Sequence, residues 1–120
     1  MTKRIQVVED DPDILEAMQM MLEAAGYEVV TVSRAEKASS QAQACRPDLI
    51  LIDLLLSGQN GIKIVQELKS EESTKEIPIV MLSAHPGAAK MIEASGASAF
   101  LPKPFDIDEL LSLVKQYTGE

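Results

Sequence analysis

Short apolar runs alternate along the chain with longer stretches in which apolar residues recur every three or four positions. A short run predicts a buried strand, and the longer recurrence predicts a helix with one apolar face. The predicted strands are Ile5–Val8, Tyr27–Val32, Leu49–Ile52, Ile77–Leu82 and Ala99–Leu101. A helical pattern follows each strand: one opening at Asp11-Pro12, one over 33–45, one containing Ile64, Val65 and Leu68, a short one over 87–95, and one opening at Asp106.

Helix-boundary residues stand where the periodic stretches begin and end. Asp11 is suited to the N-cap and Pro12 to the first helical position, and Gly26 to the C-terminal stop. Asp106 followed three residues later by Glu109 predicts a capping box. The predicted buried stripes are Ile14, Met18, Met21 and Leu22 in the first helix and Ile107, Leu110, Leu111 and Val114 in the last.

Alternation of strand and helix, five times over, predicts parallel strands joined by right-handed crossovers, with helices on both faces. We therefore expect an α/β fold: a single doubly wound five-stranded parallel sheet, (βα)5 and flavodoxin-like, with strand order 2-1-3-4-5. The sequence contains no composition break, linker or repeat, so residues 1–120 are predicted to form one domain.

Composition narrows the function classes. The net charge of −8 argues against a direct nucleic-acid interface and against an anionic membrane surface. A lone cysteine, Cys45, excludes an internal disulfide and is expected to be a buried free thiol. No apolar run is long enough to target or span a membrane, so a cytoplasmic protein is expected.

Polar residues follow the predicted strands at their carboxyl ends. Glu9, Asp10 and Asp11 follow the first strand, Asp53 the third, Ser83 the fourth and Lys103 the fifth. In such sheets ligands bind beyond these ends, where the strand order reverses. Carboxylates gathered there repel one another unless a cation lies among them, and an all-oxygen ligand set favours Mg²⁺.

Asp53 stands out among the acids because aliphatic residues flank it on both sides. Alone it would be a strand-ending turn residue, but Asp10, Ser83 and Lys103 are predicted at the same edge. An Asp carboxylate can attack phosphorus and form an aspartyl-phosphate, a reaction that depends on positioning and charge neutralisation. Mg²⁺ and a lysine ammonium would supply that neutralisation.

Four segments together, VVEDD, LILIDLLLSGQNG, IVMLSAH and GASAFLPKPF, resemble the receiver domain of two-component response regulators over essentially the whole chain. The resemblance implies that Asp53 is the phosphoacceptor and that Lys103 contacts the phosphoryl group. It implies Mg²⁺ bound by Asp10 directly, by Glu9 through water, by Asp53 and by the Leu55 backbone carbonyl.

The resemblance also implies a switch. Ser83 would move toward the phosphoryl oxygens and the aromatic Phe100 would turn into the vacated space, reshaping the surface of helix 4, strand 5 and helix 5. A cis peptide bond is expected between Lys103 and Pro104. The donor would be the phosphohistidine of a histidine kinase or a histidine phosphotransfer protein, while the downstream protein target stays unknown.

Three other functions are open at this point. A degenerate receiver would act as an interaction domain without phosphorylation, although the site residues are all present. A phosphohydrolase of the haloacid dehalogenase type needs a second Asp where Leu55 stands, and a flavin-binding module needs a phosphate loop where Glu9 and Asp10 stand. We expect a signalling domain and no enzyme. His85 is interpreted as an exposed loop residue, with a place at the mouth of the site as the alternative.

Overall fold

A computed structural model describes residues 2–53, 55–56, 59–83 and 94–119. Five parallel strands form the sheet, in the order β2-β1-β3-β6-β7. Counted along the sheet-forming strands, this is the predicted order 2-1-3-4-5, so the fold prediction is confirmed. The strands are β1 (Arg4–Val8), β2 (Glu28–Val32), β3 (Leu49–Asp53), β6 (Ile79–Ser83) and β7 (Ala99–Pro102).

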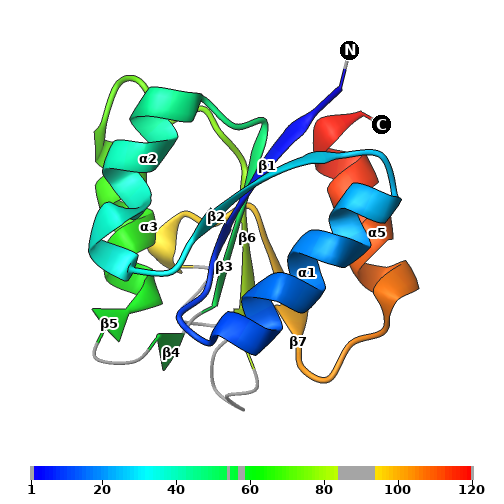
Figure 1. The fold of residues 1–120 in the computed structure, drawn as a ribbon. Coiled ribbons are helices and arrows are strands. Elements are labelled where there is room, and N and C mark those ends of the chain that lie inside the picture. The colour runs from blue at the N-terminus through cyan, green and yellow to red at the C-terminus, as the bar shows by residue number, and fades with distance from the viewer. Residues whose placement is uncertain (1, 54, 57–58, 84–93, 120) are drawn as a thin grey trace.

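Helices cover both faces of this sheet. They are α1 (Pro12–Ala24), the 3₁₀ turn η1 (Ala35–Lys37), α2 (Ala38–Cys45), α3 (Gly61–Ser70) and α5 (Ile107–Thr118). Figure 1 shows α1 and α5 on one face of the sheet and α2 and α3 on the other. No helix of the described part of the chain is long and apolar enough to cross a membrane.

Two segments need separate mention. Strands β4 (Leu55–Leu56) and β5 (Gln59–Asn60) pair antiparallel beyond the end of β3, in the region predicted as a turn. Of the helix predicted over 87–95, only residues 94 and 95 lie within the described part, and they are helical.

The sheet separates two apolar layers. β3 contributes to both, because its residues Leu49–Ile52 alternate in direction and are all fully buried. Towards α2 and α3 the core contains Val8, Val32, Ala38, Ala42, Ile50, Ile52, Ile64, Val65, Leu68, Ile79 and Met81. Towards α1 and α5 it contains Ile5, Val7, Leu15, Met18, Leu22, Leu49, Leu51, Val80, Leu82, Leu101, Leu110 and Val114.

The predicted helix boundaries are confirmed. The Asp11 carboxylate accepts hydrogen bonds from the backbone N–H groups of Asp13 (2.9 Å) and Ile14 (3.3 Å), and Pro12 begins α1. Gly26 follows this helix at a φ of 99°, a left-handed conformation that glycine adopts without strain. At α5 the predicted capping box between Asp106 and Glu109 is complete.

Two helical stripes differ from the prediction by one position each. In α1 the buried residues are Leu15, Met18 and Leu22, whereas Ile14 is 41% exposed. Met18 and Leu22 belong to both stripes, but Leu15 replaces Ile14 on the buried face, so Ile14 lies at the edge of that face. In α5 Leu110 and Val114 are buried as predicted, but Ile107 is 44% exposed because it lies in the first turn, beyond the apolar layer.

The second helix also departs from its prediction. It begins with a 3₁₀ turn at Ala35, and neither Arg34 nor Lys37 provides a side-chain cap hydrogen bond. Cys45 at its end is partly exposed rather than buried, and partial burial raises the pKa of its thiol.

Gln6 is a fully buried polar residue in β1. Its Nε2 donates to the Ala38 carbonyl at 3.0 Å, and its Oε1 lies 4.0 Å from the Cys45 Sγ, which donates to it. The side chain therefore links the centre of the sheet to both ends of α2. Satisfied in this way, a buried amide is tolerated within an apolar layer.

Candidate functional site at the carboxyl edge of the sheet

Strand register brings the acidic residues of β1 beside Asp53. Val8 pairs with Ile52, so Glu9 and Asp53 follow at the same level on adjacent strands. Adjacent strands lie about 4.8 Å apart. The sequence placed these residues at one edge from strand order alone, and the register confirms that their backbones are neighbours there.

The next two strands extend the same edge. Asp53 pairs with Leu82, so Ser83 lies one step further along β6. Ser83 pairs in turn with Pro102, the last residue of β7, so Lys103 follows immediately. The edge thus presents an acid, Asp53, Ser83 and Lys103 in succession from β1 to β7.

The acids after β1 occupy different environments. Glu9 is only 4% exposed; its backbone N–H donates to the Val32 carbonyl at 3.0 Å, and its Oε2 accepts from the Asp11 N–H at 3.3 Å. Asp10 is partly buried, whereas Asp11 is exposed and caps α1. A carboxylate as buried as Glu9 is unfavourable unless polar partners or a cation compensate for its lost hydration.

Ser83 and Lys103 are joined through the backbone. The Ser83 carbonyl accepts a hydrogen bond of 2.8 Å from the Lys103 N–H. Ser83 is 2% exposed, and Lys103 is partly buried. The peptide bond between Lys103 and Pro104 is cis, as predicted. The Ser83 hydroxyl and the Lys103 ammonium group thus belong to two residues whose backbones are hydrogen-bonded to each other at the end of the sheet.

Phe100 lies on the same face of the sheet as Ser83. Phe100 pairs with Met81, and side chains two residues apart on a strand share a face, so positions 81, 83 and 100 face the layer under α2 and α3. Phe100 is partly buried and packs against that layer. The Phe100 ring and the buried Ser83 therefore lie on one face of the sheet, on adjacent strands.

Several predicted site residues are only partly described. Asp53 ends β3 and Leu55 begins β4, but their side chains are outside the described part, and His85 lies outside it altogether. No three of the described His, Cys, Asp and Glu side chains gather as a metal site. The buried Glu9 and partly buried Asp10 supply hard oxygen donors at the edge, which suit Mg²⁺. The site assignments for Asp53, Leu55 and the metal remain predictions.

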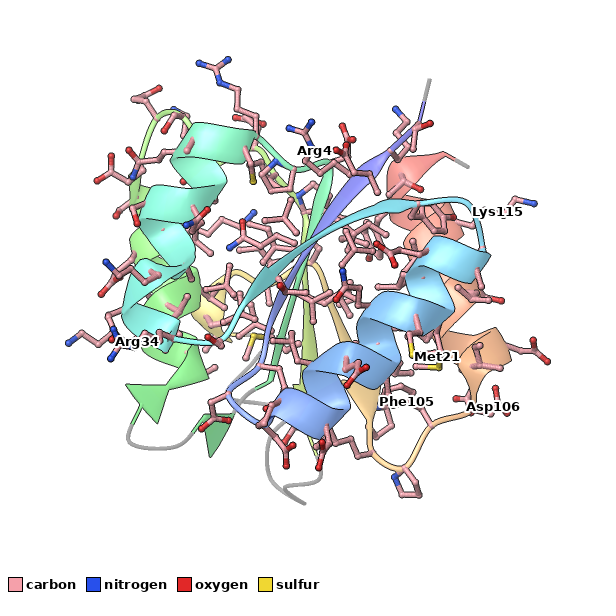
Figure 2. All side chains as sticks on the ribbon, in the orientation of Figure 1. Arg4, Met21, Arg34, Phe105, Asp106 and Lys115 are labelled. Atoms are coloured by element: carbon pink, nitrogen blue, oxygen red, sulfur yellow. The ribbon has the colours of Figure 1, made fainter. Side chains whose placement is uncertain are left out.

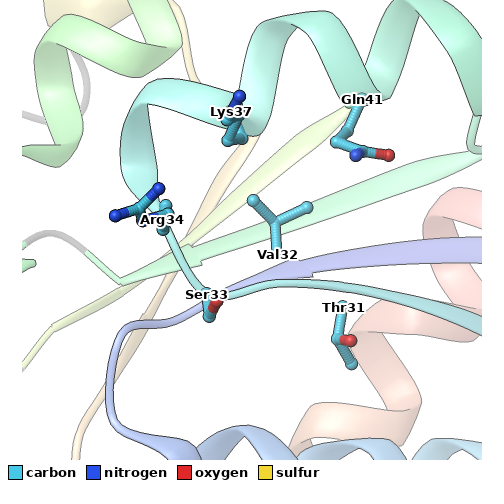
Figure 3. A pocket seen from close by; sticks show the side chains of 6 residues that line it. All are labelled: Thr31, Val32, Ser33, Arg34, Lys37 and Gln41. Carbon is cyan, nitrogen blue, oxygen red and sulfur yellow. The ribbon is translucent and has the colours of Figure 1, made fainter.

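A pocket near this edge was not identified from the sequence. It lies at the carboxyl end of β2 and is lined by Thr31, Val32, Ser33, Arg34, Lys37 and Gln41 (Figure 3). The available signal was the pair of cations spaced three apart, Arg34 and Lys37, directly after a strand of a strongly acidic chain.

Known proteins share both the sequence pattern and the fold. The response regulator receiver domain family matches residues 5–115. The chain is 38% identical to the DNA-binding dual master transcriptional regulator RpaA of Synechocystis sp., over 93% of this chain and 47% of that protein. It is 37% identical to the phosphate regulon transcriptional regulatory protein PhoB of Escherichia coli, over 96% of this chain and 51% of that protein. It thus spans about half the length of these two relatives.

One relative is of similar length: the polar-differentiation response regulator DivK of Brucella ovis is 30% identical over 100% of this chain and 99% of that protein. Among solved structures, chemotaxis protein CheY4 of Vibrio cholerae superposes with a TM-score of 0.90 at 28% identity, covering 98% of this chain and 99% of that chain. The receiver domain of the Pseudomonas aeruginosa sensor histidine kinase PA1611, solved with a magnesium ion in its active site cleft, gives a TM-score of 0.91 at 29% identity, with 100% of both chains covered.

Proposed function

Because this chain belongs to the response regulator receiver domain family, we propose that Asp53 is the residue on which it accepts a phosphoryl group. The observation that supports this assignment is the register of the sheet. It places Asp53 between the buried Glu9 on one side and Ser83 with Lys103 on the other. The phosphoryl-accepting position is therefore the centre of the charged edge.

The residues after β1 fit a Mg²⁺ site of the kind present in the PA1611 receiver. Asp10 and Asp53 would ligate the ion directly, Glu9 through a water molecule, and Leu55 through its backbone carbonyl. Bound there, Mg²⁺ supplies positive charge that offsets the phosphoryl oxygens and the crowded carboxylates. Glu9 is nearly buried and its Oε2 accepts a hydrogen bond from the Asp11 N–H. Both observations support a contact from Glu9 to the ion through a water molecule and not a direct one.

In the proposed transfer, an Asp53 carboxylate oxygen attacks the phosphorus of a donor phosphohistidine. The new O–P bond forms as the P–N bond breaks, and the imidazole leaves with the electron pair of that bond. The Lys103 ammonium and the Ser83 hydroxyl donate hydrogen bonds to the transferred oxygens. No proton has to be removed from the nucleophile, because a carboxylate is already ionised at neutral pH.

The placement of Ser83 and Phe100 on one face of the sheet supports a proposed switch. Ser83 moves toward the phosphoryl oxygens, and Phe100 turns into the space that it leaves. This rearrangement alters the surface formed by the predicted helix over 87–95, β7 and α5. Phosphorylation favours one of two pre-existing arrangements through its extra contacts with that arrangement.

Several broader assignments accompany this proposal. Residues 1–120 form one receiver domain that signals in the cytoplasm and does not turn over a substrate. Its phosphodonor is a histidine kinase or a histidine phosphotransfer protein. Its own surface, with the chain at a net charge of −8, makes no direct contact with nucleic acid.

Intact-protein mass spectrometry with acetyl phosphate and Mg²⁺ tests the assignment. The wild type is expected to gain the mass of one phosphoryl group, and Asp53→Asn is expected to gain none. Asp11→Asn is a matched control, because Asp11 caps α1 and an Asn side chain keeps the cap. Phosphorylation of Asp53→Asn, or of neither protein, would exclude Asp53, and the second result would support a degenerate receiver.

Lys103→Ala tests the second assigned role. This variant is expected to fold, as judged by circular dichroism, but to accumulate phosphate slowly or to fail to bind its partner when phosphorylated. A wild-type time course together with wild-type partner binding would contradict the role of Lys103. Turnover of small phosphate esters many times per molecule would instead indicate a phosphohydrolase.

A further inference from the structure

The pocket at the carboxyl end of β2 is separate from the proposed phosphorylation site. Its volume is about 150 Å³. Figure 3 shows Thr31, Val32 and Ser33 on the strand side of the pocket and Lys37 and Gln41 on the helical side, with Arg34 at the connection. It is thus walled by β2 and by the first turns of the following helical segment.

The lining of this pocket is cationic and polar. Arg34 and Lys37 bring two positive charges, Thr31 and Ser33 bring hydroxyl groups and Gln41 an amide, so Val32 is its single apolar lining residue. This concentration of positive charge lies on a chain whose net charge is −8. Two positive charges at the rim of one pocket attract an anion, and an anion seated there would gain from both.

The acidic partner of Arg34 among the described residues is Glu36, and it is held loosely. The Arg34 Nε lies 3.8 Å from a Glu36 carboxylate oxygen, and the two side chains are 71% and 57% exposed. An exposed pair at that separation is worth little, so Arg34 can exchange Glu36 for a better-placed anion. Glu36 itself is not among the residues that line the pocket.

The pocket is open to solvent, so its volume limits the group that is seated in it and not the whole ligand. Its volume admits several water molecules and therefore a tetrahedral oxyanion. It is well below the roughly 300 Å³ at which pockets for larger organic ligands begin. Hydroxyl and amide groups supplement the two cations as donors, which matches an anion with several acceptor oxygens.

We infer that the pocket between β2 and α2 is a binding site for a small phosphate-type dianion, either free phosphate or the phosphoryl group of a small monoester. The site differs from the phosphoryl position at Asp53, which lies at the end of β3, two strands away. It is connected to the acidic edge by one backbone contact, since the Val32 carbonyl accepts the hydrogen bond of the Glu9 N–H at 3.0 Å. The inference goes beyond the proposed function and does not depend on it.

Amide chemical-shift titration tests the site directly. ¹⁵N-labelled protein is titrated with inorganic phosphate and, in a second arm, with O-phosphoserine, in metal-free buffer at constant ionic strength maintained with chloride. Saturable shifts are expected at the amides of residues 31–41. Tighter binding of O-phosphoserine would identify a monoester as the ligand, and tighter binding of phosphate the free ion.

Three variants establish where the anion binds. Loss of both charges in Arg34→Gln/Lys37→Gln is expected to weaken binding about tenfold, given the strength of charge-assisted hydrogen bonds. Lys63→Gln/Lys115→Gln removes the same charge from exposed positions on α3 and α5, outside the pocket, and is expected to bind as the wild type does. Gln41→Met removes a donor without changing the charge and should weaken binding to a smaller extent.

The same titration on Asp53→Asn separates this site from the phosphorylation site, because its shifts should be unchanged. Absence of saturable shifts at residues 31–41 would overturn the inference. So would equal weakening in the two doubly substituted proteins, because that result would indicate general attraction by net charge. Circular dichroism on each variant establishes that a lost shift reflects the pocket and not unfolding.

Discussion

In the absence of metal, the Asp53→Asn variant is expected to be more stable than the wild type. In saturating Mg²⁺ the wild type is expected to be the more stable of the two. In the proposed site Asp53 lies beside the acids of β1, with Glu9 at the same level on the neighbouring strand. Removing its charge relieves repulsion while retaining the size and shape of the side chain. Adding Mg²⁺ changes the balance, because the variant has lost one of the proposed ligands.

The register sets the size of the effect. At a separation of about 6 Å, somewhat more than the spacing of about 4.8 Å between strands, two carboxylates on adjacent strand ends repel each other appreciably. At that separation two unit charges repel by about 0.7 kcal/mol in bulk water and about 2.8 kcal/mol at an effective dielectric constant near 20. Because Glu9 is almost buried, the repulsion lies toward the upper part of this range. In the opposite direction, a hundredfold excess of Mg²⁺ over its dissociation constant stabilises the wild type by about 2.7 kcal/mol.

Urea denaturation with and without Mg²⁺ measures both effects. In EDTA the variant should unfold at higher urea than the wild type, and in saturating Mg²⁺ the order should reverse. Glu67→Gln, which removes an exposed acid from α3, should change stability by less than about 0.5 kcal/mol in either buffer. The electrostatic reasoning would be refuted if Asp53→Asn were destabilising in EDTA, or if Mg²⁺ stabilised both proteins equally.

Three further predictions follow from described contacts. Gln6→Leu removes the 3.0 Å hydrogen bond from the buried Gln6 amide to the Ala38 carbonyl and should lower the free energy of unfolding in urea by about 1 kcal/mol. At α5, the Asp106 Oδ1 accepts from the Glu109 N–H at 2.9 Å and the Asp106 N–H donates to the Glu109 Oε1 at 3.3 Å, so Asp106→Ala should cost about 1 kcal/mol in the same assay. Partial burial raises the pKa of the Cys45 thiol, so iodoacetamide at pH 8 should alkylate the folded protein more slowly than the protein in urea. With the folded pKa above the unfolded one, the Cys45 contribution to stability is present at neutral pH and is lost as the pH rises through the thiol range, which a comparison with Cys45→Ser across that range measures.

Matched variants give these predictions their controls. Gln43→Leu alters an exposed glutamine on α2 and should leave stability within about 0.5 kcal/mol of the wild type. Asp106→Ser keeps an N-cap acceptor and should retain most of the stability that Asp106→Ala loses. The stabilising role of the Gln6 hydrogen bond would be contradicted if Gln6→Leu were as stable as Gln43→Leu. Equal stability of the two Asp106 variants would contradict the role of the cap. Equal alkylation rates of Cys45 in the folded and unfolded protein would contradict its raised pKa.

The sequence predicted what depends on periodicity and strand order, and missed what depends on helix packing. Strand order follows from the alternation of strands and helices, and it was sufficient to predict that Glu9, Ser83 and Lys103 share an edge. The outward position of Ile14 was not predictable in the same way, because a stripe shifted by one residue is almost as apolar and only packing against the sheet selects between the two. The burial of Gln6 was not predictable either, since a polar residue in a strand is expected to be buried only when its partners on α2 are known.

The pocket beside β2 could not be predicted from the sequence either. In the sequence, Arg34 and Lys37 are ordinary residues of a charged connection. Only the fold brings them to one pocket with Thr31 and Val32 of β2. Asp53 and Lys103 lie within the four segments that carry the family resemblance, whereas Arg34 and Lys37 lie outside them. On a chain with a net charge of −8, a cavity lined by two cations attracts anions whether or not a motif contains it. The backbone bond from Glu9 to Val32 then gives the two sites a common element, so an anion held at β2 and a cation held at β1 would each affect the same strand pair.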